Sequence, residues 1–313
     1  MKTLNILVMT LLLVTVILSG CASESDPDGK KTIKLATSAE WTQRADGLPH
    51  FQEHYGFEFP ELAVVDLGLA YQAVGTGMAD VGIGDATEGR IIQYDLVVLE
   101  DDQLFFPAYN PAPVVRSKLL KTYPELPEVI HELSSRLDLE TLTRLNKMVS
   151  VDQTMPQEAA RKYLLEQNLI QDQSPEKDPQ KEIPIVVSSK TFTEALILGY
   201  LTSYLLEDRG YTVVDEIGLG ETAVITPALF SGQIDLYWEY TGTGLMNVMR
   251  HTEVVTDPRE CYGLVKNWYL ENHDVLWLDY APANNTFVLF TSRDLHEQYG
   301  WNKISDLGVY LSQ

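Results

Sequence analysis

Three short segments place aromatic side chains next to small polar ones, at residues 105–110, 237–243 and 284–287. Such segments could hold a quaternary ammonium ion, whose nitrogen has no N–H to donate in a hydrogen bond. The faces of several rings attract such a cation by about 2 kcal/mol each once water is excluded. Aromatic clusters also fill hydrophobic cores, so the composition by itself leaves both interpretations open.

The sequence carries none of the common catalytic or metal-binding motifs. It has no P-loop, no GxSxG and no HExxH, and its six histidines lack the spacing of metal ligands. Once Cys21 is assigned to a lipid anchor, as below, Cys261 alone can form neither a disulfide nor a cysteine-based metal site. We therefore expect no enzyme, no cofactor and no metal.

The chain carries a net charge of −22, and its acidic residues are spread along the sequence. A field of this sign disfavours nucleic acid and anionic membrane surfaces as partners. It is compatible with a cationic or zwitterionic small molecule.

The N-terminal segment has the pattern of an export signal. Lys2 is followed by an apolar run over 6–18 and by the small residues Ser19 and Gly20, and this run is too short for a spanning helix, so residues 1–20 are expected to be a signal peptide. The sequence up to Cys21 is similar to the lipobox of bacterial lipoproteins, which implies that Cys21 is lipidated and that 21–31 are an anchor and tether. The expected location is the extracytoplasmic face of the cell membrane; the alternative is a secreted protein with a chance cysteine.

Short apolar strands alternate with helical patterns along the rest of the chain, which is typical of an α/β fold with mainly parallel sheets. The charged, proline-containing stretch 171–182 reads as a linker. The patterns predict strands at 33–36, 62–67, 81–84, 96–99, 185–188, 213–215, 235–238, 275–278 and 287–291, and helices at 68–76, 127–137, 139–149, 157–167, 193–208, 222–231 and 258–272.

A weak internal repeat relates residues 70–84 to residues 225–239, each running from a helix into a strand. If the two halves are structural duplicates, Asp85 and Tyr240 occupy equivalent positions at the carboxyl end of a strand. Ligands of open α/β sheets bind at such ends.

Longer motifs extend over nearly all of the chain after the tether. Residues 189–194 (SKTFTE), 218–220 (GLG), 235–243 (DLYWEYTGT) and 281–286 (APANNT) resemble the first lobe of the glycine betaine/choline/carnitine-binding proteins of ABC importers. Residues 44–49 (RADGLP), 66–69 (DLGL), 99–102 (LEDD) and 105–116 (FFPAYNPAPVVR) resemble the second lobe and return segment of that family. The resemblance implies a two-lobed type II periplasmic-binding-protein fold with a ligand cleft between the lobes.

The order of these motifs departs from the family, because the half that usually comes second comes first here. The resemblance therefore implies a circular permutation, with the old termini joined through 171–182. Lobe I is then continuous over 104–292, and lobe II is assembled from 32–103 and 293–313. A fragment of a tandem array and a dimer with swapped halves are alternatives to the self-contained monomer that we favour.

The resemblance also implies a ligand site made by aromatic and polar side chains. Tyr240, Phe287 and Tyr109 would be the walls of an ammonium cage, with Phe287 where the family usually has tyrosine. Asn285 and Thr243 would supply polar contacts at its rim.

Charged residues decide which ligand such a cage accepts. Lys190 and Arg44 match the pair that holds the carboxylate of betaine in the family, although Arg44 could instead form an ion pair with Asp46. Asp85 stands where the family usually completes the cage with an aromatic. It could pair directly with a cation, which would favour choline, or it could cap the following helix while Trp41 supplies the missing ring.

The expected function is that of an extracytoplasmic binding protein that delivers glycine betaine or choline to an ABC permease and its ATPase. Hinge bending at crossings near 103–106 and 290–294 would close the lobes over the ligand. The alternatives are another cationic or zwitterionic solute, such as carnitine, proline betaine or an amino acid, or a ligand-sensing module outside transport.

Overall fold

The computed structural model describes residues 31–44, 46–172 and 178–312. The export signal expected at 1–20 lies outside these residues, as do Cys21 and nearly all of the tether. Within the described ranges, no helix combines the length and the apolar character needed to cross a bilayer.

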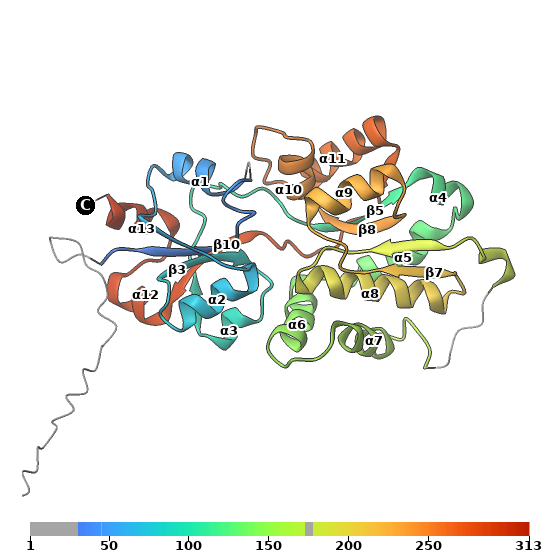
Figure 1. The fold of residues 1–313 in the computed structure, drawn as a ribbon, viewed down its shortest axis with the longest axis horizontal. Helices are drawn as coiled ribbons and strands as arrows, with labels where there is room; N and C mark the ends of the chain where they lie inside the picture. The colour runs from blue at the N-terminus through green and yellow to red at the C-terminus, as the bar shows by residue number, and fades with distance from the viewer. Residues whose placement is uncertain (1–30, 45, 173–177, 313) are drawn as a thin grey trace, which may run out of the picture. The chain divides into compact units, whose positions relative to one another are not determined.

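One five-stranded sheet defines lobe II and contains strands from both ends of the chain (Figure 1). β1 is parallel to β2 and β3, whereas β10 is antiparallel to β3 and β4. The order is β2-β1-β3-β10-β4, with bounds Glu61–Val64 for β2, Lys34–Thr37 for β1, Val81–Asp85 for β3, Phe287–Ser292 for β10 and Leu96–Val98 for β4.

A second five-stranded sheet defines lobe I and repeats this arrangement. β6 is parallel to β7 and β8, and β5 is antiparallel to β8 and β9. Asp85 and Tyr240 end the equivalent strands β3 and β8, as the internal repeat predicts. The order is β7-β6-β8-β5-β9, with bounds Val213–Glu216 for β7, Ile185–Ser188 for β6, Leu236–Tyr240 for β8, Pro111–Arg116 for β5 and Val275–Trp277 for β9.

Helices cover both faces of each sheet. In lobe II they are α1 (Leu48–Tyr55), α2 (Leu67–Gly75), α3 (Arg90–Gln93), α12 (Arg293–Tyr299) and α13 (Ile304–Leu311). In lobe I they are α4 (Ser117–Thr122), α5 (Leu126–Ser134), α6 (Leu139–Ser150), α7 (Pro156–Glu166), α8 (Thr193–Asp208), α9 (Thr222–Ser231), α10 (Thr241–Thr243), a π-helix (Gly244–Val248) and α11 (Pro258–His273), with a 3₁₀ turn at Pro179–Lys181. Figure 1 shows α8 and α9 on opposite faces of the lobe I sheet.

Strand alternation sends neighbouring side chains into different cores. Leu289 of β10 packs with the α1 and α13 side chains, whereas Phe290 stacks on Tyr71 of α2 with ring centroids 4.6 Å apart. In β8, Leu236 faces the α8 side and Tyr237 the α9 side. The two faces of each sheet are thus buried, which leaves the carboxyl ends of β3 and β8 as the places for a ligand.

β5 is a strand that the sequence patterns miss, because Pro111 and Pro113 look like strand breakers. Their carbonyl groups accept hydrogen bonds from the N–H groups of Ala281 and Leu278, at 2.8 and 2.9 Å, beyond the end of the edge strand β9. The N–H and C=O of a strand residue point to the same side, so the N–H groups that proline lacks would also face that side. Pairing with β8 is therefore undisturbed.

The second crossing between the lobes lies earlier than the sequence predicts. A crossing at 290–294, with the lobe boundary at 292/293, is wrong because Phe287 to Ser292 already pair with β3 and β4. The crossing comes before Phe287, in the segment that carries Asn284 and Asn285. Of the predicted cage residues, Asn285 therefore lies in the crossing and Phe287 directly follows it.

Candidate functional site

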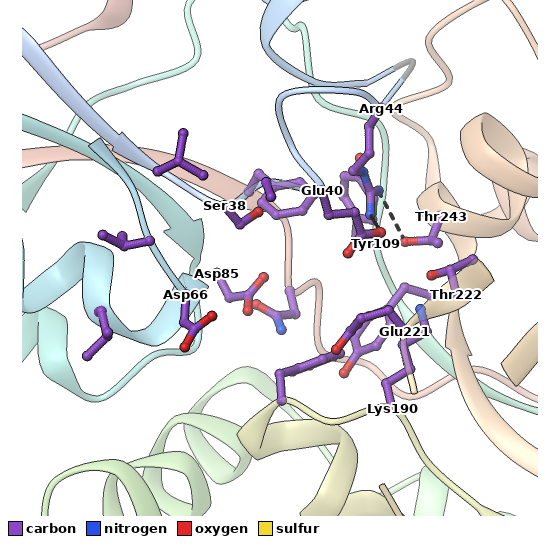
Figure 2. A pocket seen from close by; sticks show the side chains of 18 residues that line it. Ser38, Glu40, Arg44, Asp66, Asp85, Tyr109, Lys190, Glu221, Thr222 and Thr243 are labelled. Carbon is purple, nitrogen blue, oxygen red and sulfur yellow. Dashed lines mark hydrogen bonds and ion pairs between the residues drawn. The ribbon is translucent and has the colours of Figure 1, made fainter. Parts of the chain in front are cut away.

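A cavity of about 470 Å³ is lined by both lobes at the carboxyl ends of β3 and β8 (Figure 2). This volume lies within the range of about 300–1,000 Å³ typical of small-molecule sites. In Figure 2, Asp66 and Asp85 project from the lobe II side, and Lys190 and Glu221 from the lobe I side. The lining includes most of the residues that the sequence predicts, namely Arg44, Asp85, Tyr109, Lys190, Tyr240, Thr243, Asn285 and Phe287.

Aromatic rings from separate segments face this cavity. Tyr109 and Phe287 meet at nearly right angles, with ring centroids 5.4 Å apart. Tyr240 lies 5.8 Å from Phe192, a ring at the N-terminus of α8 that the sequence analysis does not single out. Four aromatic residues thus line the cavity, and the faces of such rings attract cations.

Lys190 is already paired inside the protein. Its Nζ lies 2.5 Å from a carboxylate oxygen of Glu239, and both residues are buried. Glu239 also accepts hydrogen bonds from the hydroxyl of Tyr237 and the N–H of Tyr240. The ammonium group lies 5.6 Å from the centre of the Tyr240 ring. A ligand carboxylate would therefore have to compete with Glu239 for this lysine.

Arg44 is held in the same way. Its guanidinium donates two hydrogen bonds to Asp46, at 2.7 and 2.6 Å, in a fork that also reaches Glu40 at 3.2 Å. The ion pair with Asp46 that the sequence offers as an alternative is present, and it lies at the cavity rather than on an open surface. The guanidinium also lies 5.1 Å from the centre of the Phe287 ring.

The same pair joins the two lobes. Asp46 accepts a hydrogen bond from the hydroxyl of Tyr109, and Arg44 donates to the hydroxyl of Thr243 at 3.4 Å, which Figure 2 marks with a dashed line. In the amide orientation whose oxygen faces the guanidinium, Asn247 lies 3.1 Å from it. Lobe II therefore contacts lobe I through the charged groups at this end of the cavity.

Asp85 differs from the two cations because its carboxylate stands alone. In the part of the chain that the structure describes, no hydrogen bond or ion pair reaches that carboxylate. Burial, together with repulsion from Glu194 and Glu88, raises the pKa of Asp85 to about 8. The side chain caps no helix, because α3 begins five residues later without a side-chain cap.

Trp41 does not line the cavity, contrary to the prediction that it completes the cage. It is 1% exposed and packs in the lobe II core, with its ring centroid 5.6 Å from that of Phe51. Packing there removes the large indole from water almost completely. The alternative in which Asp85 caps a helix and Trp41 supplies the missing ring is therefore wrong in both parts.

Several acidic and polar groups of the site are not among the predicted residues. Asp66 and Glu221 precede the equivalent helices α2 and α9, and both line the cavity. Glu194, behind the rings, accepts a hydrogen bond from the hydroxyl of Tyr240 at 2.8 Å. An acidic residue in the first turn of a helix whose following turns are mainly apolar is the sequence signal that could have identified Glu194. Among the described residues, no group of three or more His, Cys, Asp or Glu is arranged to hold a metal ion.

The buried Lys190–Glu239 pair makes a prediction about stability. Glu239→Gln leaves the ammonium of Lys190 buried without its counter-charge, so we expect a loss of about 3–5 kcal/mol in the free energy of unfolding. Urea denaturation measures it. Asp152→Asn is the matched control, because it breaks the exposed pair with Lys147 and should cost less than about 1 kcal/mol. Equal effects of the two substitutions would contradict the burial of the Lys190 pair.

Several known proteins similar to this chain are transport binding proteins. A glycine-betaine-binding protein of Pseudomonas aeruginosa is 34% identical over 153 residues, which make up 48% of this chain and 49% of that protein. The carnitine transport binding protein OpuCC of Listeria monocytogenes is 33% identical over 129 residues, 41% of this chain and 42% of that protein. The chain spans about half, or less, of the length of these curated relatives. A crystal structure of a glycine betaine/carnitine/choline ABC transporter has 31% sequence identity and a TM-score of 0.35, over 44% of this chain and 50% of that one.

A match over most of the chain identifies the family to which it belongs. The model of the substrate binding domain of ABC-type glycine betaine transport systems matches residues 22–166 and 183–312. Members of this family bind solutes for transport and are not enzymes, in line with the expectation from the sequence. The chain belongs to this family of ABC-transporter substrate-binding domains, with the two-sheet α/β fold of the type II periplasmic binding proteins.

Proposed function

We propose that this chain captures a quaternary ammonium cation in the cavity between its lobes and presents it to an ABC permease. Family membership supports the role in transport. Rings from both lobes support the ligand class, because a fully methylated nitrogen can be held only by ring faces and opposite charge.

The proposed ligand is a cation without a carboxylate, of the choline type. The observation that carries this choice is the pairing of charges in the cavity. Lys190 and Arg44, the groups that would bind a carboxylate, are neutralised by Glu239 and Asp46, whereas Asp85 has a carboxylate with no partner among the described residues. An anionic ligand group would also meet repulsion from Asp85 at pH values at which that carboxylate is ionised. Glycine betaine is the second candidate, favoured by the names of the similar proteins.

Lobe closure is the proposed mechanism of capture. The two crossing segments, before Pro107 and before Phe287, can act as the hinge. Closure brings the rings of Tyr109 and Tyr240 against the lobe II residues and excludes water, which strengthens each electrostatic contact with the cation. A permease would then recognise the closed form.

Circular permutation is the proposed reason for the inverted order of the motifs. The family match consists of two blocks separated at 167–182, a gap that includes the whole predicted linker 171–182. Relatives align with about half of this chain, as expected if a collinear alignment can follow one block at a time. Each half supplies four strands of one sheet and one strand of the other, β5 or β10, so exchanging their order along the chain can leave every strand in its sheet.

A rearranged chain tests the permutation. Residues 183–312 joined through a flexible linker to residues 32–166 restore the order of the family, and we expect this chain to fold as a monomer and to bind the same ligand within about threefold in Kd. Calorimetry and light scattering provide the two readouts. A wild-type protein that is a dimer through exchanged halves, or a rearranged chain that cannot fold, would contradict a self-contained permuted monomer.

Attachment to the extracytoplasmic face of the membrane through lipidated Cys21 is a further part of the proposal. It rests on the lipobox-like sequence before Cys21. Metabolic labelling with a fatty acid, compared between the wild type and Cys21→Ser, tests it.

The choice of ligand can be measured by calorimetry with choline, glycine betaine, carnitine and proline betaine. We expect choline to bind most tightly, and Tyr240→Ala or Tyr109→Ala to lose at least about thirtyfold in affinity, since one ring contributes about 2 kcal/mol. Asp85→Tyr should shift the preference toward glycine betaine, because it replaces a negative charge by a ring. An unchanged order of ligands in Asp85→Tyr would remove Asp85 from the site.

The raised pKa of Asp85 predicts how affinity depends on pH. A cation binds the ionised carboxylate, so the affinity for choline should rise as the pH increases toward about 8 and level off above it. Below that value, each pH unit weakens binding by up to tenfold, and binding releases about one proton. Calorimetry in buffers of different ionisation enthalpy counts the protons. Asp85→Asn should abolish the dependence, and a variant that keeps it would show that another group titrates.

A further inference from the structure

Glu194 forms a buried hub behind the aromatic rings. It is 2% exposed, and its carboxylate accepts four hydrogen bonds. One oxygen accepts from the hydroxyl of Thr87 and the amide of Asn146, both at 2.7 Å. The other oxygen accepts from the hydroxyl of Tyr240 at 2.8 Å and the amide of Asn285 at 3.0 Å. Every partner donates, so the hub is suited to an ionised carboxylate.

The four donors come from both lobes and from the crossing between them. Thr87 follows β3 in lobe II, Tyr240 ends β8 in lobe I, and Asn285 lies in the crossing before β10. Thr87 also donates its N–H to the side-chain oxygen of Asn285, at 3.3 Å. A ring of the cavity and a hydroxyl of the opposite lobe therefore depend on the same carboxylate.

We propose that Glu194 is a positioning residue that couples the orientation of the Tyr240 ring to closure of lobe II. When the Tyr240 hydroxyl is bound, one oxygen of Glu194 is fixed and the other is held in place for Thr87. A ligand that packs against the ring thereby favours the closed lobes. This inference rests on the proposed function for the identity of the ligand, but the coupling between Thr87 and Tyr240 belongs to the protein itself.

The surroundings of the hub show that closure at this end is tight. A Cβ added to Gly89 of lobe II would lie 2.7 Å from Cα of Lys147 in α6, so the backbones of the two lobes are nearly in contact there. Ser150 of α6 also donates a hydrogen bond to Glu88, at 2.5 Å. This second bond joins the lobes without touching Glu194 or Tyr240, and it provides an internal control.

A double-mutant cycle tests the coupling. Thr87→Val keeps the shape of the side chain but removes its hydroxyl, and Tyr240→Phe keeps the ring but removes its hydroxyl. For each single variant we expect at least about a fivefold increase in the Kd for choline, mainly through faster dissociation, because a hydrogen bond to a charged group is lost. Thr87→Ser should restore most of the affinity.

The double variant decides between a coupled hub and two separate bonds. If Glu194 connects the two hydroxyls, Thr87→Val and Tyr240→Phe combined should deviate at least about threefold from the product of the single effects. The change in Kd of the double variant Ser150→Ala and Tyr240→Phe should equal the product of the two single changes, because the two hydrogen bonds share no partner. Independent effects of Thr87→Val and Tyr240→Phe, or an equal deviation in the Ser150 pair, would overturn the proposal.

Failure of the proposed ligand class would be distinguishable. If the wild type binds none of the four quaternary ammonium compounds, the proposed function falls, and the same cycles are then read from urea denaturation of the ligand-free protein. Coupling between Thr87 and Tyr240 in that measurement supports the hub. Additive effects on the free energy of unfolding overturn it.

Discussion

A fully methylated ammonium ion offers a protein charge and surface but no hydrogen-bond donor, so a site for it must supply ring faces and exclude water. This constraint explains why the rings of the cavity come from both lobes. Neither lobe alone encloses the cavity, because Tyr109 and Tyr240 belong to lobe I and Phe287 begins the last strand of lobe II. Binding and closure are therefore two aspects of one event in this fold.

Charge pairing inside the protein determines what the closed cavity can accept. Two buried cations, Lys190 and Arg44, each have an internal carboxylate partner, and separating either pair in a buried site is costly. Asp85 also lines the cavity, and its carboxylate has no partner among the described residues. Burial raises its pKa, so its ionised form is disfavoured until a cation binds beside it. The rings of the cavity could hold the ammonium group of betaine, but the paired cations and the carboxylate of Asp85 favour a ligand of net positive charge.

Much of the fold could be predicted from the sequence, since apolar runs such as 185–188 and 287–291 are short and bounded by turn residues. β5 could not, because whether Pro111 interrupts a strand depends on where the neighbouring strand ends. The cage residues were found through motifs, whereas Trp41 shows that a motif cannot say whether a ring faces a core or a cavity. The partner of Lys190 lies 49 residues away on another strand, so its neutralisation is visible only in the folded protein.

The most direct measurement of the central claim compares choline with 3,3-dimethyl-1-butanol, which has the same shape but a neutral carbon in place of the charged nitrogen. Calorimetry of both ligands separates attraction by charge from apolar fit. If ring faces and Asp85 recognise the cation, choline should bind at least about thirtyfold more tightly than the neutral analogue, corresponding to about 2 kcal/mol. Equal affinity for the two compounds would contradict a site built for a permanent positive charge.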